Sequence, residues 1–280
     1  MRALEELFQV AGLFKRRSEY AALIEFAAKC KSYAPYNAML VRIQKPGAVF
    51  VATAEEWRDK YGRAVRGTAK PLLVLEPGAP VRFVFDVSDT EGDDAALPAE
   101  VLKPFAAVAA KDVEKKLQQL IKNCLRDGVQ VLEASLGEQV AGKIVRVSSK
   151  DQLKTANYRP AEAQKDFEIF LNSDLDSPAR LAALIHELAR LYCGHLGAGS
   201  RSKWPGRQGL TTTEAQFESE SVAYIVCTRL GLENKPDSYL SGFLKEAGDI
   251  PDVSVDRIMA SASLIMSMCT KQLPPRRRRR

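Results

Sequence analysis

The sequence predicts an α+β protein: a small N-terminal α/β module followed by a mainly helical domain with a short sheet. Segments with apolar residues at helical spacing stand apart from short segments that alternate between apolar and polar residues. The chain has 280 residues, 46% of them hydrophobic, which is enough for two ordinary cores. Composition changes most sharply at the acidic segment 88–100. We therefore expect domains over 1–90 and 98–273, with a disordered arginine tail over 274–280.

The first domain is predicted from alternating helix and strand signals. A long amphipathic helix at 4–30 ends before the SYAPYN segment, and a second helix at 38–44 ends at the KPG turn. A third helix at 54–62 stops at Gly62. The strand candidates, of which VRFVFDV alternates most cleanly, are residues 48–53, 71–77 and 81–87.

The second domain begins with helical spacing over 101–127 and continues with three strand candidates, 129–134, 142–149 and 167–173. The next helix has Ser177 as its predicted cap and Pro178 in its first turn, and Gly194 ends it. A threonine run caps another helix, which Gly231 closes. Two last helices are expected at 238–246 and 253–273.

Charge and cysteine usage narrow the functional classes. The formal net charge is +6, but five consecutive arginines at 276–280 supply most of it and the rest carries only +1. That tail either contacts phosphates nonspecifically or is an artefact of cloning or reading frame. Five scattered cysteines without a C-x-x-C pair indicate reduced thiols in a cytosolic protein. No apolar run of about 18 residues and no signal peptide is present, so we expect a cytoplasmic chain without a membrane span.

The segment IHELARLYCGHLG contains an interrupted metal-binding pattern. In H-E-x-x-H, two histidines one helical turn apart hold a metal, and the glutamate between them takes a proton from a bound water. Here His186 and Glu187 are present, but the fifth position is Arg190, whose guanidinium cannot bind a cation. A following helix carries three carboxylates, Glu214, Glu218 and Glu220.

Two interpretations of this segment stay open. In the first, His195 folds back across the Gly194 turn and completes a zinc site with His186 and Glu218 or Glu220, while Glu187 acts as general base. In the second, Arg190 places its own cation where a metal would be, pairs with Glu218 or Glu220 and preserves the fold without the catalyst. A His-Glu pair on an apolar helix is also common without any metal.

Cys193 lies two turns beyond His186, too far to share an ion with it, and is expected to be a core thiol.

At this point the sequence resembles two known families. The segments LIHELARLYCGHLG and TTTEAQFESESVAYIVCTRLGL resemble the two-helix core of ImmA/IrrE-type metallopeptidases. The N-terminal segment resembles the front domain of ArdC-type antirestriction proteins. The matching positions are Tyr36, Asn37, Gln44, Pro46, Trp57, Gly62, Arg63, Val65, Gly67 and Lys70, the last with one extra residue in the spacing.

The resemblance implies a front domain that binds single-stranded DNA and a rear domain with a zinc-peptidase fold, with an antirestriction or mobile-element role. It implies His186 as ligand, Glu187 as general base and one glutamate of the 216–220 stretch as third ligand. Position 190 departs from the pattern, and so does Gln216, which falls where some relatives have a ligating glutamate.

The nucleic-acid prediction also has a basis in the residues themselves. Cations and aromatic rings are interleaved over about thirty residues, a combination that can follow a phosphate backbone and stack on bases. The alternative is a solvated basic surface around a buried tryptophan. The predicted contact residues are Tyr36, Asn37, Arg42, Gln44, Lys45, Trp57, Arg58, Arg63, Arg66 and Lys70. Two hypotheses follow. In one, the chain has a degraded peptidase site and acts by binding single-stranded DNA or a protein partner. In the other, it is an active zinc endopeptidase that cleaves a protein substrate and uses His186, His195 and a glutamate of the next helix.

Overall fold

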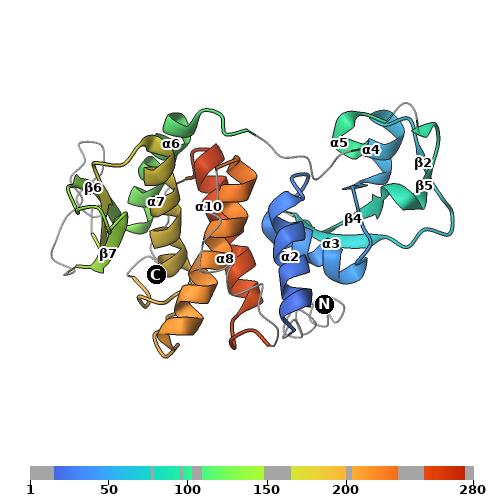
Figure 1. Cartoon of the computed structure of the whole chain (residues 1–280). Helices are drawn as coiled ribbons and strands as arrows, with labels where there is room; N and C mark the ends of the chain where they lie inside the picture. Colours follow the sequence, from blue (N-terminus) through green and yellow to red (C-terminus); the bar gives the residue numbers. More distant parts are fainter. Residues whose placement is uncertain are drawn as a thin grey trace. The chain divides into compact units, whose positions relative to one another are not determined.

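The fold is α+β, as the sequence predicts, and it divides into two compact units (Figure 1). A computed structural model describes residues 16–76, 79–94, 97–102, 109–147, 165–199, 204–232 and 249–274. Unit 1 comprises residues 1–108 and 247–250, and unit 2 comprises residues 109–246 and 251–280. Within the described ranges no helix is both long enough and apolar enough to cross a bilayer. The predicted helix at 238–246, the first part of the helix at 4–30 and the arginines at 276–280 lie outside the described residues.

Unit 1 combines short helices with a three-stranded antiparallel sheet in the order β1-β4-β3 and a separate β2-β5 pair. Its elements are α2 (Arg17–Lys29), α3 (Pro35–Gln44), β1 (Val51–Ala52), α4 (Ala54–Asp59), β2 (Ala64–Val65), β3 (Leu72–Glu76), β4 (Ala79–Asp86), β5 (Thr90–Glu91) and α5 (Ala99–Leu102). The predicted strand at 48–53 is reduced to β1, and α3 begins three residues before the predicted start because Pro35 occupies its first turn.

Successive side chains of β3 and β4 point to opposite faces of the larger sheet of unit 1, and they contribute to two separate buried clusters. Leu72, Val74 and Val84 pack with apolar residues of α2 and α3 in one cluster. Phe85 belongs to a second cluster, which surrounds Trp57 of α4. A capping box at Thr53 starts α4, which places the indole against the sheet.

The acidic segment predicted as a linker is part of unit 1. Strand β5 pairs with β2, and Asp94 forms an ion pair with the buried Arg63 at 2.7 Å. The two compact units divide between residues 108 and 109. The acidic composition of this segment indicated solvent exposure, but it could not show that Thr90 and Glu91 form a strand that pairs with β2.

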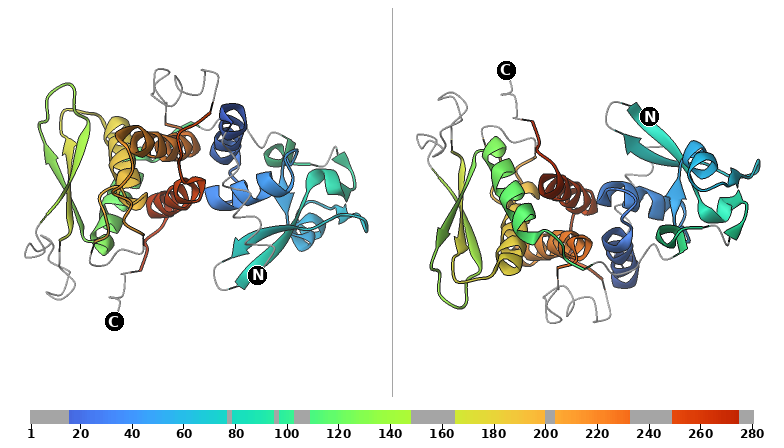
Figure 2. Two further views of the ribbon diagram at one scale, coloured as in Figure 1. Left: turned by 90° about the horizontal axis from the view of Figure 1, so that it is seen from below. Right: turned by 90° about the horizontal axis from the view of Figure 1, so that it is seen from above.

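The described residues of unit 2 form four main helices and a three-stranded sheet in the order β6-β8-β7, in which β6 is parallel and β7 antiparallel to β8. The elements are α6 (Val113–Cys124), β6 (Val129–Ala134), β7 (Gly142–Arg146), β8 (Phe167–Asn172), α7 (Ser177–Tyr192), α8 (Thr212–Leu230) and α10 (Val255–Thr270). Figure 2 shows the sheet along one side of the helices, next to α6 and α7, with α8 and α10 beyond them.

The predicted signals set most of the bounds of α7 and α8. Thr211 caps α8 through a capping box with Glu214, and Gly231 closes that helix with a φ of 73°. The cap of α7 is Asp176, whose carboxylate accepts the Ala179 N–H at 2.9 Å, and not Ser177. Both residue types cap helices, so the sequence left the choice between neighbours open.

Two side-chain amides of α3 complete the exposed edge of β3. The Asn37 amide accepts the Leu75 N–H at 2.9 Å and donates to the Leu75 carbonyl at 2.8 Å. Gln44 bonds the N–H and the carbonyl of Leu73 in the same way, each at 2.9 Å. An edge strand otherwise leaves such groups unpaired. Asn37 and Gln44 therefore hold α3 against the sheet.

We predict that replacing Gln44 by Ala speeds amide hydrogen exchange at Leu73 about tenfold, because its N–H loses its acceptor. Leu75, which Asn37 binds, serves as the internal control and should keep its rate. The reciprocal variant, Asn37→Ala, should affect Leu75 and spare Leu73. Equal acceleration at both amides in both variants would show that the two side chains do not act locally.

Candidate functional site

The candidate site of unit 2 lies where α7, the turn after it and α8 meet. Helix α7 carries His186, Glu187 and Arg190, and the chain then turns at Gly194 to reach His195. Helix α8 packs beside α7 and carries Glu218 and Glu220. Because residues two apart on a helix point in nearly opposite directions, these two carboxylates cannot meet at one point.

His186 faces Glu220. Its Nδ1 lies 3.7 Å from a carboxylate oxygen of Glu220, which is longer than a hydrogen bond. Burial, followed by the electrostatic influence of Arg190 and of the His195 side chain, lowers the pKa of His186 to about 4. Burial also raises the pKa of Glu220. At neutral pH the imidazole is uncharged, so it is in the form that could bind a metal.

One carboxylate oxygen of Glu187, the residue predicted as general base, is already engaged in hydrogen bonds. Glu187 is buried, and this oxygen accepts the Ile144 N–H of β7 at 3.0 Å and an Arg190 N–H at 2.9 Å. Burial raises the pKa of Glu187, although Arg190 and the Ile144 N–H oppose this. Arg190 thus pairs with Glu187, which corrects the sequence-based expectation that its partner is Glu218 or Glu220. A residue three positions away on the same helix is its nearest acid.

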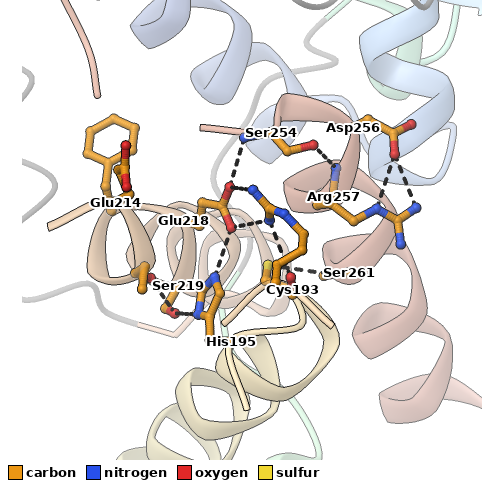
Figure 3. A network of polar contacts seen from close by, with 12 residues as sticks. Cys193, His195, Glu214, Glu218, Ser219, Ser254, Asp256, Arg257 and Ser261 are labelled. Carbon is orange, nitrogen blue, oxygen red and sulfur yellow. Dashed lines mark hydrogen bonds and ion pairs between the residues drawn. The ribbon is translucent and has the colours of Figure 1, made fainter. Parts of the chain in front are cut away.

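The second acid-histidine pair lies beyond the end of α7. His195 Nε2 lies 2.8 Å from a carboxylate oxygen of Glu218, and Nδ1 lies 3.4 Å from the Ser219 hydroxyl. Figure 3 shows Glu218 at the centre of this cluster, with His195 and the backbone of Ser254 directed toward it. An ionised carboxylate only accepts hydrogen bonds, so Nε2 carries the proton.

Arg207 is the main partner of Glu218. Its two terminal nitrogens donate to the two carboxylate oxygens at 2.6 and 2.8 Å, a bidentate pair. Ser254 adds a backbone N–H at 2.7 Å. Burial alone would raise the pKa of Glu218, but the hydrogen bonds from His195, Arg207 and Ser254 outweigh it and hold the pKa below its ordinary value. Glu218, with none of its surface exposed, is therefore ionised and fully satisfied.

The loop that carries Arg207 is held against the end of α7. Trp204 packs edge to face on Tyr192, with ring centroids 5.1 Å apart, and donates from its indole to the Gly197 carbonyl at 3.3 Å. Gly194 has a φ of 91°, and a Cβ there would lie 2.2 Å from the Pro205 carbonyl oxygen. Only glycine permits this close approach. The loop is thereby positioned so that Arg207 reaches Glu218.

The predicted zinc ligands do not form one site. His186 lies next to Glu220, whereas His195 lies next to Glu218. In the described part of the chain, one group of three possible ligand atoms converges, and it belongs to Cys193, His195 and Glu218. Those three ligand atoms lie within 4.8 Å of one another. Cys193 is a buried thiol, as expected, but it also belongs to this cluster, which spacing from His186 alone could not indicate. With the Glu218 carboxylate held by Arg207, the residues present do not fit the zinc site that the resemblance implies.

Several predicted nucleic-acid contacts in unit 1 have structural roles instead. Asn37 and Gln44 bind the edge of β3, as described above. Trp57 is fully buried, packs against Phe50 and Tyr61 and donates its indole N–H to a β4 carbonyl at 2.8 Å. Arg63 is buried and binds Thr90 as well as Asp94. All four side chains are therefore engaged within unit 1, and of the four only Gln44 also lines the hollow described below.

Three other predicted residues lie near the surface but are engaged locally. The guanidinium of Arg42 lies 5.6 Å from the centre of the Phe26 ring and binds the Pro46 carbonyl. Arg58 is exposed and pairs with its neighbour Asp59 at 2.7 Å. Tyr36 is half-buried.

The remaining predicted cations, Lys45, Arg66 and Lys70, line one hollow in unit 1. This hollow has a volume of about 370 Å³, and its other lining residues are Gln44, Thr68, Ala69, Leu72 and Asp89. Lys45 pairs with Asp89 at 2.7 Å, and Arg66 donates to the Ser88 carbonyl at 3.2 Å. Lys70 is exposed and has no ion pair with any described residue. The lining of the hollow therefore holds three cations and one carboxylate, and the buried carboxylate of Asp86 lies 3.7 Å from Nζ of Lys45.

Phe83 is an exposed aromatic residue outside the predicted set of nucleic-acid contacts. Its exposed fraction is 54%, and it is the only aromatic residue of the described ranges in the exposed class. It lies on β4 opposite Leu73, on the sheet face that also holds Phe85. Alternation in VRFVFDV predicted that both phenylalanines share a face, but not that α4 covers only Phe85.

Comparisons with known proteins give remote similarities only. No protein-family model matches the chain, and no curated protein matches it. The Mn(II)-bound crystal structure of the antirestriction ArdC protein from the R388 plasmid is 13% identical, with 84% of each chain covered and a TM-score of 0.36. Its metal-free structure is 12% identical, with 83% of this chain and 81% of that chain covered and a TM-score of 0.33. Similarity at this level carries no inference about what this chain does.

We predict that Glu218→Gln lowers the free energy of unfolding of unit 2 by about 3 kcal/mol at neutral pH, because Arg207 loses its buried counter-ion. The folded-state pKa of Glu218 lies below the unfolded value of 4.5, so its contribution is complete above that pH and is lost as the pH falls through the folded-state pKa. Urea unfolding should show the difference between native protein and variant shrinking below about pH 4.5.

Glu138→Gln changes an exposed glutamate of the same unit and serves as the control, with an expected effect within about 0.5 kcal/mol. A Glu218→Gln effect that is equally small, or independent of pH, would contradict the assigned role of this carboxylate.

Proposed function

We propose that this chain is a single-stranded DNA-binding protein of the ArdC type, in which unit 1 binds the nucleic acid and unit 2 is a peptidase-like domain without catalytic activity. An antirestriction or mobile-element role accompanies this proposal, as the sequence resemblance implies. One observation carries the binding function: three of the predicted contact cations, Lys45, Arg66 and Lys70, line a single hollow.

The chemistry of the hollow suits a phosphodiester backbone. Phosphate oxygens accept hydrogen bonds from ammonium and guanidinium groups, and the volume of about 370 Å³ lies within the range of clefts that hold small ligands. Asp89 offsets one of the three charges and positions Lys45 by direct pairing. Lys70 and Arg66 are the cations that the hollow leaves most exposed to an incoming phosphate.

Preference for single strands is proposed from the exposed ring of Phe83. Unstacked bases bind aromatic faces with about 1–3 kcal/mol per base, and a duplex does not present those faces. Phe83 has the exposure that Trp57 lacks. In this proposal it replaces Trp57 as the stacking residue of unit 1.

We predict that Lys70→Ala and Arg66→Ala each weaken binding of a single-stranded oligonucleotide. Each variant should also make the slope of log K against log salt shallower by about 0.7, which is the value for one lost phosphate contact. Filter binding at several salt concentrations measures this. All proteins in the comparison carry serine at 276–280, so that the arginine tail does not contribute.

Lys143→Ala removes an exposed lysine of unit 2 and is the matched control, which should leave affinity and slope unchanged. If Lys143→Ala and Lys70→Ala weaken binding equally, the hollow is not the binding site. A salt-independent affinity in the native protein would remove the nucleic-acid function altogether.

The alternative of an active zinc endopeptidase is less well supported. It needs His186, His195 and one glutamate at the same ion, but the two histidines pair with different acids. It also needs Glu187 facing a bound water, whereas that carboxylate accepts the Ile144 N–H and pairs with Arg190.

We predict that protein purified without an affinity tag contains far less than one zinc ion per chain and does not hydrolyse an unfolded casein substrate. Elemental analysis and a fluorescent peptide-release assay measure the two properties. Two variants serve as comparisons. The endopeptidase would be established instead if the native protein hydrolysed the substrate and Glu187→Gln abolished that hydrolysis, and if the native protein held one zinc ion per chain that His186→Ala removed.

A further inference from the structure

The side chains of Cys193, His195 and Glu218 converge in unit 2 without having a role in the proposed function. Their ligand atoms lie within 4.8 Å of one another, and the thiol, imidazole and carboxylate are the three ligand types that zinc accepts in proteins. Two of them come from the end of α7 and the turn after it, and the third comes from α8 (Figure 3).

A cation already occupies the carboxylate of this cluster. Arg207 binds both oxygens of Glu218, at 2.6 and 2.8 Å, and its Nη1 also donates to the Cys193 carbonyl at 3.2 Å. His195 and the Ser254 N–H take the other two acceptor positions of the carboxylate. A carboxylate offers about four such positions, so a metal ion could bind Glu218 only by displacing the guanidinium.

The position of Arg207 is built into the fold. Its backbone N–H donates to the Gly194 carbonyl at 2.8 Å, so the loop residue is tied to the same turn that directs His195. Trp204, three residues earlier, is buried against Tyr192. Two separate contacts of the loop, the backbone hydrogen bond to Gly194 and the packing of Trp204 on Tyr192, therefore position the guanidinium in the cluster.

Charge balance makes a guanidinium and a zinc ion interchangeable here. With Arg207 in place, the cluster contains one carboxylate, one guanidinium and a neutral thiol, which sum to zero. If Zn²⁺ replaced the guanidinium and the thiol released its proton to solvent, the dication would face one carboxylate and one thiolate, which again sum to zero. One dication thus compensates for the departure of one guanidinium charge and one proton.

We propose that Arg207 is a built-in counter-ion that keeps a Cys193–His195–Glu218 zinc site closed, and that removing its guanidinium opens this site to Zn²⁺. The inference goes beyond the proposed function, because it concerns a cluster separate from the His186 and Glu187 motif and does not involve nucleic acid. It also assigns the metal-replacing role, which the sequence suggested for Arg190, to a different arginine.

Metal content of the full chain tests the proposal. Untagged proteins are equilibrated with excess Zn²⁺, dialysed and analysed for bound zinc. The native protein should retain far less than one ion per chain, and Arg207→Ala about one. Arg207→Lys, which keeps a cation, should remain free of zinc. Adding Cys193→Ser to Arg207→Ala should abolish retention, because one of three ligands is then missing.

Thermal unfolding gives a second readout. Arg207→Ala should lower the Tm of unit 2 by about 10 °C without zinc, because it leaves a buried carboxylate without its counter-ion. Added Zn²⁺ should restore much of that loss in Arg207→Ala, but not in the variant that also carries Cys193→Ser. The Tm of the native protein should not respond.

Stoichiometric zinc in the native protein, or no zinc in Arg207→Ala, would overturn the proposal. If Arg207→Ala precipitates, the milder Arg207→Gln is measured in its place with the same expectations. If both variants are insoluble, recovery of soluble protein from a zinc-supplemented culture supports the proposal, and insolubility in that culture contradicts it.

Discussion

The arrangement of unit 2 depends on one buried charge, the carboxylate of Glu218. An ionised group without solvent contact is costly unless hydrogen bonds and an opposite charge compensate for it. The compensation comes from three separate places in the sequence: His195 after α7, Arg207 in the loop before α8 and the backbone at the start of α10. Satisfying this one side chain therefore fixes the turn, the loop and two helices relative to one another.

Unit 1 is organised by a different constraint, the open edge of β3. Two amides seven residues apart on α3 pair with two alternate backbone positions of the strand. Asn37 and Gln44, which the sequence suggested as nucleic-acid contacts, therefore have a structural role at the sheet edge. Gln44 also lines the hollow that holds Lys45 and Lys70.

Local signals in the sequence predicted the elements better than the site. Thr211, Gly231 and the apolar stripe of α7 act within a few residues of themselves, so their consequences were predictable. The site depends on contacts between distant residues. Nothing in the loop sequence indicated that Arg207, instead of Arg190, would reach the buried acid, because that choice depends on Trp204 packing on Tyr192 and on the close approach at Gly194. Similarly, the burial of Trp57 and the exposure of Phe83 depend on how much of a sheet face α4 covers.

The hydrogen bond from Ile144 to Glu187 affects how the sheet of unit 2 can be extended. Strand β7 is an edge strand, and a free edge is where an extended peptide can add as a further strand. Glu187 takes the Ile144 N–H from the side of α7, and this donor lies in the middle of the strand. A guest chain aligned along β7 would lack one main-chain partner at its centre, because Glu187 already accepts that N–H.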